Sequence, residues 1–248
     1  MSKRFTVSPD FSPDYLSGWY LFNKWMQQQT GLKIKLELYS DFYAQRIVTY
    51  SNEADLVYVN PFDASMLVRD KGFLPLAKVA GNYDETVIVA HNESSINSLD
   101  DLKPDLKLAM TEDPNINMIG MMLLEAIDLE EDNIKKTIYD NHVLIVKNLL
   151  EDKMDAGLFL AKAYDELSWV VKKQLKILLQ SEIGELHHTF LISPNLAEKK
   201  DEIQSLLINM DKNREGQDVL KSLGFDAWIT IDDREMEFMI DLIDALSI

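Results

Sequence analysis

Polar and aromatic residues follow short apolar runs at several points in the chain. In the clearest case the apolar run Leu56–Val59 is followed by Asn60, Pro61 and Phe62. A run of this length is enough for one buried strand, and proline is favoured in the first turn of a helix. Open α/β sheets bind ligands at such strand-to-helix turns. Asn60 and Phe62 are therefore candidate ligand-binding residues, although both could instead cap the helix and fill the core.

A second turn of this kind is the segment 111–117, which reads Thr-Glu-Asp-Pro-Asn-Ile-Asn between a predicted strand and a predicted helix. Thr111, Asn115 and Asn117 could donate hydrogen bonds to a ligand oxygen. The Asp-Pro pair in the same segment is also a good helix N-cap. The sequence leaves ligand contact and capping both open.

The first two loops of the chain add further candidates. Ser8, Asp10 and Tyr15 lie in and after the turn that ends the first predicted strand, and Tyr39 and Phe42 lie where a half-exposed strand meets the next helix. Aromatic side chains at such positions could stack on a ligand, or they could pack the loop itself. The sequence does not choose between these roles.

The chain offers little material for catalysis or for a metal site. It has four histidines and no cysteine, and it contains no phosphate-binding loop, no dinucleotide-binding glycine motif and no nucleophile-elbow motif. His187 and His188 are adjacent at the start of a predicted strand, where their side chains would point to opposite faces and could not bind one metal. A hinge or solvent-facing position is predicted for them. We expect no catalytic residue, no metal and no cofactor.

Composition limits the class of partner. The 248 residues are 46% hydrophobic, which is enough for a sizeable core, and the net charge is −17. So acidic a surface disfavours nucleic acid and anionic membranes, and no segment is apolar enough to insert into a membrane. No apolar stretch of signal-peptide length follows the first residues, which favours a cytoplasmic protein; a periplasmic one is expected if a leader has been removed.

Strands alternate with helices nearly throughout, which predicts an α/β fold with mainly parallel sheets. The expected strands are 5–8, 33–39, 56–59, 74–80, 86–90, 107–110, 138–139, 156–159, 177–179 and 188–192, and the expected helices are 15–29, 61–71, 115–127, 143–152, 162–174, 196–210, 216–223 and 234–246, with one more from residue 42. The chain could cross between two lobes near residues 90 and 190. We therefore predict one lobe from residues 1–89 and 189–248 and a second from residues 90–188.

Several of these segments occur in a characteristic order. A polar helix start at Tyr39–Tyr43 precedes the strand and turn Asp55–Pro61, then the capped turn Ser98–Leu102, and later the segment Val146–Ala156. This order, over about residues 5–210, resembles the type II periplasmic-binding-protein fold, and within it the phosphate, phosphite and phosphonate substrate-binding proteins of ABC transporters. The resemblance implies two lobes that close by a hinge on a ligand in the cleft between them. Strand-end loops and helix N-termini would line that cleft, and such N-termini can bind an anion without a lysine.

The resemblance also implies particular site residues. The family's aromatic residue at a helix start matches Phe42 or Tyr43, and its histidine before a later helix matches His142. Its site residue after the third strand matches Asn60 to Phe62. Two positions depart from the family: the segment 111–117 replaces a glycine-containing, Ser/Thr-rich cradle for the phosphonate, and Leu160 stands where an acidic residue often contacts an amino group.

These observations predict a non-catalytic protein that closes on a small oxyanion or phosphonate-like molecule and resembles the solute-binding component of an ABC transporter. A transporter permease or a sensor protein would recognise the closed state. An alternative is a cytoplasmic ligand sensor or carrier with the same fold, which the changed cradle would suit. A further alternative is a biosynthetic enzyme on this fold, for which His142 beside Asp140 is the only candidate.

Overall fold

The computed structural model describes residues 2–246, and the chain forms two compact units. Unit 1 is built from the residues up to Tyr83 together with His187–Ala245, and unit 2 from Asp84–Leu186. The boundaries expected from the sequence come later, after residues 89 and 188. The first boundary differs because strand β5 (Thr86–His91) pairs with β8 (Ala156–Leu160) and β9 (Leu175–Gln180), which are strands of unit 2.

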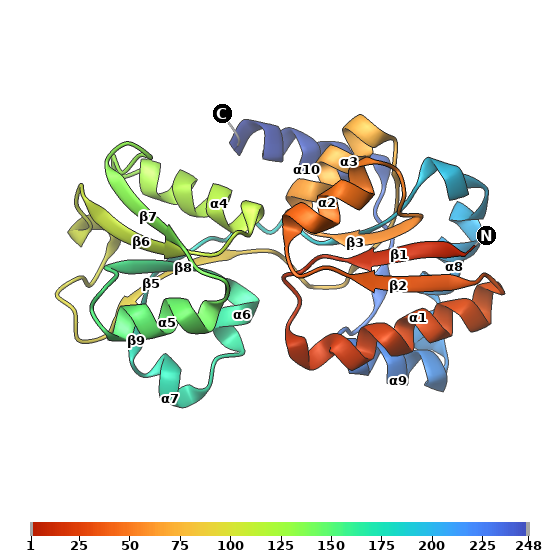
Figure 1. Cartoon of the computed structure of the whole chain (residues 1–248), viewed down its shortest axis with the longest axis horizontal. Coiled ribbons are helices and arrows are strands. Elements are labelled where there is room, and N and C mark those ends of the chain that lie inside the picture. Colours follow the sequence, from red (N-terminus) through yellow and green to blue (C-terminus); the bar gives the residue numbers. More distant parts are fainter. Residues whose placement is uncertain (1, 247–248) are drawn as a thin grey trace. The chain divides into compact units, whose positions relative to one another are not determined.

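The described part of unit 1 contains a six-stranded sheet in the order β11-β4-β10-β3-β1-β2. Figure 1 labels three neighbouring strands of it, β3, β1 and β2. Its strands are β1 (Lys3–Val7), β2 (Ile34–Leu38), β3 (Leu56–Val59), β4 (Leu74–Val79), β10 (Thr189–Ile192) and β11 (Trp228–Ile229). β1 pairs in parallel with β2 and β3, and Val7 lies opposite Leu38 and Tyr58. The carboxyl ends of β1, β2 and β3 therefore meet at one edge of the sheet, which we call the unit 1 edge.

Helices cover both faces of this sheet. They are α1 (Leu16–Thr30), α2 (Phe42–Tyr50), α3 (Pro61–Lys71), α8 (Lys200–Ile208), α9 (Arg214–Leu223) and α10 (Asp233–Leu246), with short 3-10 helices at Pro13–Tyr15, Pro194–Lys199 and Met210–Lys212. α1 and α9 lie on one face, and α2 and α3 on the other (Figure 1). Apolar side chains of α1, such as Trp19 and Phe22, pack edge to face with Phe5 and Phe190 of the sheet, which fixes this face.

Local sequence explains how α3 begins and ends. The Asn60 side chain accepts a hydrogen bond from the backbone N–H of Asp63, and Pro61 occupies the first helical position, where its missing N–H costs nothing. Gly72 ends the helix in the left-handed conformation with φ +70°, which glycine adopts without strain. The start and end expected for this helix are confirmed.

The described part of unit 2 contains a five-stranded sheet in the order β7-β6-β8-β5-β9. Its other strands are β6 (Leu106–Met110), β7 (Ile134–Ile138), β8 (Ala156–Leu160) and β9 (Leu175–Gln180). β6 is parallel to β7 and β8, so the carboxyl ends of these three strands also meet at one edge, the unit 2 edge. β5 is antiparallel to both of its neighbours.

The helices of unit 2 also lie on both faces of their sheet. They are α4 (Pro114–Glu125), α5 (His142–Leu150), α6 (Ala161–Asp165) and α7 (Trp169–Lys172), with a 3-10 turn at Leu99–Asp101. α4 covers one face, with Ile116 and Leu124 packed on Leu158, and α5 covers the other, with Ile145 packed near Phe159 (Figure 1). Two separate apolar clusters result, one on each side of β8.

Four predicted features need correction. Both sheets are mixed rather than mainly parallel, because β4, β5, β9, β10 and β11 run antiparallel to their neighbours. The strand expected at 138–139 lies at Ile134–Ile138, and the two-residue strand β11 was not expected. The helix expected at 162–174 is two short helices, since Ser168 caps a new helix by accepting from Val171 N. In the segment 196–210 only Lys200–Ile208 is α-helical.

Within residues 2–246 no helix has both the length and the apolar character needed to span a bilayer.

Candidate functional site

Parallel pairing brings the loop candidates of unit 1 to one edge. Ser8 follows β1 and donates its backbone N–H to the carbonyl of Tyr58 at 2.7 Å, which holds the first loop beside the end of β3. Tyr39 follows β2, and Asn60 follows β3. Phe42 and Phe62 lie in the first turns of α2 and α3 on the same edge. Strand ends of this kind are where α/β sheets place ligands.

Asn60 is fully buried and serves the fold directly. Its Oδ1 accepts from the backbone N–H of Asp63 at 2.8 Å, and its Nδ2 donates to the Asp63 carboxylate at 3.0 Å. Both polar atoms of the side chain are therefore engaged in unit 1. Ligand contact through Asn60 stays a prediction, and any contact would add to this capping role.

A buried carboxylate, Asp63, joins α2 to α3 through a pairing with Arg46 that the sequence did not predict. Asp63 is 2% exposed and accepts from Arg46 Nε at 2.6 Å and from Arg46 Nη2 at 3.1 Å. Burial and the Asp63 charge raise the pKa of Tyr50, whose hydroxyl donates to the same carboxylate at 3.4 Å, to about 12. Such a fork-to-fork pair is geometrically specific. It ties together the two helices whose N-termini reach the unit 1 edge.

Two aromatic candidates flank the Arg46 guanidinium. The guanidinium carbon lies 5.9 Å from the ring centroid of Phe42 and 5.3 Å from that of Phe62. These distances are within the range of cation–π attraction. Phe42 and Phe62 therefore pack the Arg46–Asp63 pair in this structure, and stacking on a ligand stays a prediction for both. The spacing of Phe42 and Arg46, one helical turn apart, is the signal that could have revealed this cluster.

Asp10 pairs with a histidine that the sequence placed elsewhere. The carboxylate oxygens of Asp10 lie 3.0 and 3.2 Å from Nε2 of His188. Burial alone would raise the pKa of Asp10, but the charge and hydrogen bond of His188 outweigh it and hold the pKa below its ordinary value. The His188 ring also lies 5.3 Å from the Tyr58 ring. This pair fixes the first loop against the start of β10.

Of the two positions predicted for the histidine pair, the solvent-facing one is wrong, because both side chains are buried, and the hinge position stays a prediction. His188 is 8% exposed and His187 is 1% exposed. Burial, together with the nearby charge of Lys78, lowers the pKa of His187 to about 4. The two rings have different partners, as expected for neighbours in an extended segment. Among residues 2–246 no group of three or more acidic or histidine side chains could hold a metal ion.

The two tyrosine candidates of unit 1 have protein contacts. Gly224, at the end of α9, lies directly against the Tyr15 ring, since a Cβ on Gly224 would be 2.8 Å from ring atoms. The Tyr39 hydroxyl donates to Glu37 at 3.0 Å, and burial and this bond raise the pKa of Tyr39. Packing and a strand-end hydrogen bond thus account for both positions, and their ligand roles stay predictions.

The unit 2 edge presents the second set of candidates. Thr111 follows β6, and Tyr139, which follows β7, donates its backbone N–H to the carbonyl of Met110 at 2.8 Å. His142 occupies the first position of α5, and its ring stacks on Phe159 with centroids 5.1 Å apart. Leu160 ends β8 and is 8% exposed. The structure thus brings Thr111 and His142 to the same edge.

The turn 111–117 leaves polar atoms without partners. Asp113 caps α4 by accepting from the N–H groups of Asn115 and Ile116 at 3.0 and 3.2 Å, and Asn117 Nδ2 donates to the Thr111 carbonyl at 2.8 Å. Asn115 is 1% exposed, and neither its Oδ1 nor its Nδ2 has a hydrogen-bond partner among the described residues. The same holds for Asn117 Oδ1 in this part of the chain. Buried amides normally find partners, so these atoms have hydrogen-bonding capacity that residues 2–246 do not use.

Comparison with known proteins agrees with this geometry. Residues 5–236 match the family described as ABC transporter, phosphonate, periplasmic substrate-binding protein. The chain belongs to this family. The family expectation drawn from the order of motifs is confirmed, and so is the two-unit α/β fold. A comparison with curated proteins gives no match.

Solved structures show the same fold at low sequence identity. PhnD1 from Prochlorococcus marinus MIT 9301, in complex with methylphosphonate, has a TM-score of 0.84 at 14% identity, covering 99% of this chain and 98% of that one. A binding component of an ABC phosphonate transporter from Pseudomonas aeruginosa has a TM-score of 0.77 at 19% identity, covering 98% and 87%. The alkanesulfonate-binding protein SsuA from Xanthomonas axonopodis, bound to MOPS, has a TM-score of 0.67 at 14% identity, covering 99% and 93%.

Family membership defines the class of activity. Proteins of this family are substrate-binding components, so the role of the chain is non-catalytic ligand binding, with a small molecule and an ABC transporter permease as partners. The enzyme alternative, which relied on His142 and Asp140, is therefore set aside. By its description the family is periplasmic.

Proposed function

We propose that the chain binds a small tetrahedral oxyanion of the phosphonate or sulfonate type, through the turn 111–117 of unit 2. The observation that carries this proposal is the buried amide of Asn115, whose donor and acceptor atoms lack partners among residues 2–246. A phosphonate monoanion offers both acceptors and an O–H donor, which matches both polar atoms of an amide, whereas a sulfonate offers acceptors to the amide N–H groups alone. The backbone N–H groups of α4 start at the same turn.

Electrostatics favour a singly charged ligand over a dianion. The acidic side chains Asp10, Asp41 and Asp113 all lie at the strand ends, where each accepts hydrogen bonds from its surroundings. The one arginine near these loops, Arg46, is paired with Asp63. The Asp10 charge is paired with His188, so a dianion would be repelled chiefly by the carboxylates of Asp41 in unit 1 and Asp113 in unit 2. A methylphosphonate monoanion or a sulfonate would meet less repulsion.

Calorimetric titration tests this proposal. We expect methylphosphonate and methanesulfonate to bind, with inorganic phosphate weaker, and Asn115→Ala and Thr111→Ala each to weaken binding by at least about tenfold. Asn92→Ala is a matched control, since Asn92 is an exposed asparagine of the same unit. Unchanged affinity in Asn115→Ala and Thr111→Ala would remove this turn from the site. Tighter binding of phosphate than of both monoanions would overturn the charge argument.

Hinge closure belongs to the same proposal. It is supported by the family and by the presence, in each unit separately, of an edge where parallel strands end in polar loops. If both units supply groups to one ligand, Ser8→Ala in unit 1 and Thr111→Ala in unit 2 should weaken the same titration. A smaller radius of gyration with ligand, measured by X-ray scattering, would accompany closure. An effect confined to variants of one unit would contradict a shared ligand.

The sensor alternative differs in cellular location. It is favoured by one observation, the replacement of the expected Ser/Thr-rich cradle by the segment 111–117. A cytoplasmic location stays a prediction, whereas the family is described as periplasmic. Cell fractionation of the natural gene product separates the two: recovery with periplasmic markers would support delivery to a permease, and recovery with cytosolic markers would support a sensor or carrier.

A further inference from the structure

Within residues 2–245 the chain passes from one unit to the other twice, once in residues 80–85 and once in residues 181–188. We call these stretches the first and second connecting segments, and neither contains an α-helix or a strand. Each has one glycine in the left-handed conformation, Gly81 with φ +66° and Gly184 with φ +72°. Apart from the adjacent residues, no described atom lies within 4 Å of the place that a Cβ would take on either glycine. Side chains therefore leave the backbone free to rotate there.

Glu85, the last residue of the first connecting segment, holds the second segment through its carboxylate. One carboxylate oxygen accepts from the backbone N–H of Gly184 at 2.7 Å, and the other accepts from the Ser181 hydroxyl. The Ser181 oxygen in turn accepts from the backbone N–H of Thr86 at 2.9 Å. All four residues belong to unit 2, so this link forms within one unit.

Backbone hydrogen bonds extend the link to the boundary of unit 2. The N–H of Asp84 donates to the carbonyl of Leu186 at 2.8 Å, and the N–H of Ser181 donates to the carbonyl of Thr86 at 2.9 Å. Asp84 is the first residue of unit 2, and Leu186 is the last residue of the second segment that belongs to it. The two segments are therefore fixed to each other throughout the part of each that lies in unit 2.

A second carboxylate, Glu235 of α10, makes a similar link within unit 1. It accepts a hydrogen bond from Nζ of Lys78, which lies on β4 just before the first connecting segment. The same carboxylate oxygen lies 3.6 Å from Nε2 of His187 in the second segment. The Lys78 side chain is only 12% exposed, so salt screens this ion pair less than an exposed one.

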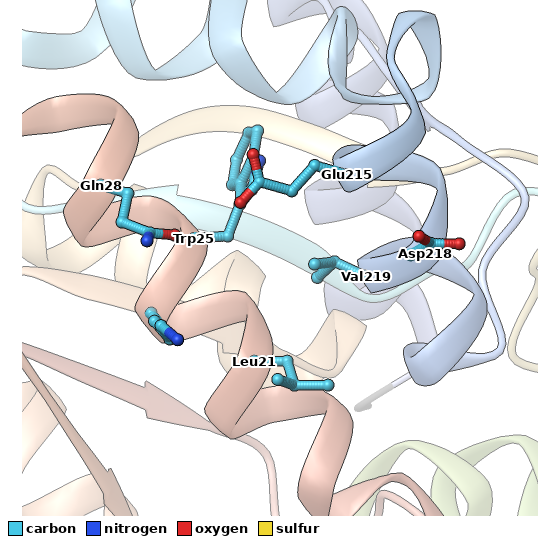
Figure 2. Close-up of a pocket in the computed structure, with 7 residues that line it drawn as sticks. Leu21, Trp25, Gln28, Glu215, Asp218 and Val219 are labelled. Atoms are coloured by element: carbon cyan, nitrogen blue, oxygen red, sulfur yellow. The ribbon is translucent and has the colours of Figure 1, made fainter.

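Unit 1 also fixes the start of the first connecting segment through β11 and α9. The backbone N–H of Ala80 donates to the carbonyl of Ala227 at 2.9 Å, next to the pairing of β11 with β4. β11 follows α9, which packs along α1. Figure 2 shows Trp25 on the side of α1 that faces α9, and Trp25 and Val219 of α9 belong to one apolar core. Residues 81–83 thus lie between a start fixed in unit 1 and an end fixed in unit 2.

We propose that Glu85 and Glu235 position the hinge: each carboxylate links the two connections within its own unit, and together they confine bending to residues 81–83 and to the peptide between Leu186 and His187. This inference rests on the hinge closure proposed above and adds which residues bend and which stay fixed. A narrow hinge gives the free protein fewer conformations, so less entropy is lost when a ligand closes it. Neither carboxylate has to contact the ligand for this effect.

Amide hydrogen exchange on the whole chain without ligand tests the link in unit 2. Glu85→Ala should make the N–H groups of residues 84 and 181 exchange at least about tenfold faster, because the two segments then separate more often. These two N–H groups donate to backbone carbonyls, so the substitution does not remove their acceptors. Ser181→Ala is a milder change in the same link and should act in the same direction. Glu85→Gln keeps one carbonyl acceptor and should restore part of the protection.

Glu182→Ala is the matched control for both substitutions, since Glu182 is an exposed carboxylate of the same segment and its removal should leave exchange unchanged. Unchanged exchange in both Glu85→Ala and Ser181→Ala would overturn the proposal. An increase of the same size in Glu182→Ala, or one spread evenly over the strands of unit 2, would also overturn it, because general destabilisation would then explain the result.

Fluorescence energy transfer between the units tests both links. The chain has no cysteine, so Lys33→Cys in unit 1 and Glu125→Cys in unit 2, both at exposed positions, can carry the two dyes. Without ligand, Glu85→Ala and Glu235→Ala should each give a wider distribution of single-molecule distances than the parent, whereas Glu237→Ala, at an exposed position of α10, should not. Equal widths in all four proteins would overturn the proposal. Failure of closure itself is recognised separately, as an unchanged radius of gyration when ligand binds.

Discussion

The two strand-end edges use their polar groups in opposite ways. At the unit 1 edge the charged side chains are paired with each other, Asp10 with His188 and Asp63 with Arg46. At the unit 2 edge Asp113 accepts only backbone N–H groups of α4 in the bonds described above, and Asn115 has no partner for either polar atom among the described residues. The charged pairs of the unit 1 edge are therefore formed without a ligand, whereas the unit 2 edge has a buried amide that forms no hydrogen bond with the described residues.

This difference predicts that substitutions at the two edges have different effects. Preformed ion pairs hold loops and helix N-termini in one geometry, which lowers the entropy cost of binding. Unpaired buried amides cost stability in the free protein and recover it when a ligand supplies partners. Variants at the unit 1 edge should thus act mainly on folding, and variants at the unit 2 edge mainly on affinity.

The largest effect is expected from Asp63→Ala. It removes the acceptor of Arg46, Tyr50 and Asn60 at once and leaves a partly buried guanidinium without its carboxylate. We expect a loss of about 3 kcal/mol in the free energy of unfolding, measured by urea denaturation. Asp70→Ala on the same helix is the control, because Asp70 is exposed and little change is expected there. Equal small effects of both substitutions would show that the unit 1 edge does not depend on this pair.

A pair of helix caps sharpens the comparison. Asn60 caps α3 in unit 1 and also bonds Asp63, whereas Asn141 caps α5 in unit 2 from an exposed position. Asn60→Ala should cost about 2 kcal/mol and Asn141→Ala about 0.5–1 kcal/mol in chemical denaturation. The larger loss is expected for Asn60 because its side chain is buried and both of its polar atoms form hydrogen bonds. A larger loss for Asn141→Ala would contradict the proposed difference between the edges.

Substitution of Asn115 should change the free energy of unfolding and the oxyanion affinity in opposite directions. Asn115→Leu removes two unpaired buried atoms, so we expect the free energy of unfolding to rise by about 1 kcal/mol while oxyanion affinity falls by at least about tenfold. Asn23→Leu in α1 is the matched buried control. The Asn23 amide donates to the Ile34 carbonyl at 3.3 Å, so its removal should lower stability and leave affinity unchanged. A destabilised Asn115→Leu variant would mean that the amide has an unrecognised structural role.

The smallest effect concerns the acid dependence of unit 1. His188 holds the pKa of Asp10 below its ordinary value of 3.8, so folding gains stability from this carboxylate above that pH and loses it as pH falls through the lowered pKa. In His188→Ala burial would dominate and raise the pKa instead, and the contribution of Asp10 would then grow as pH falls. Denaturation of both proteins between about pH 3 and 7 measures the difference. If the free energy of unfolding changes with pH in the same way for both proteins, the Asp10–His188 pair does not contribute to the stability of unit 1.

Short-range sequence patterns predict many of the helices and strands. Asn60 with Pro61 and the terminal Gly72 gave both ends of α3, and the apolar run Leu56–Val59 matched β3 residue for residue. These features depend on short-range chemistry. Strand direction does not, and for that reason the antiparallel returns of β4, β5, β9, β10 and β11 were not foreseen. The alternation of strands and helices gives the class of fold but not which strands become neighbours.

The candidate site divides in the same way. The strand-end positions of Ser8, Tyr39, Asn60 and Thr111 follow from local patterns and are where the sequence put them. The Asp10–His188 pair could not be foreseen, because its members are 178 residues apart and meet only through the pairing of β10 with β3. The packing of Tyr15 could not be predicted from local sequence either, because its contact with Gly224 depends on how α9 packs against α1.

The outermost strands of both sheets bear on how the protein behaves at high concentration. An unpaired strand edge can recruit another chain and begin aggregation, and lysine on such a strand opposes this. Lys35 lies on β2, Lys135 and Lys136 on β7, and Lys176 on β9, while the remaining outer strand, β11, has only two residues. In a chain with 25 basic and 42 acidic residues, several of the scarce positive charges thus lie where they discourage self-association.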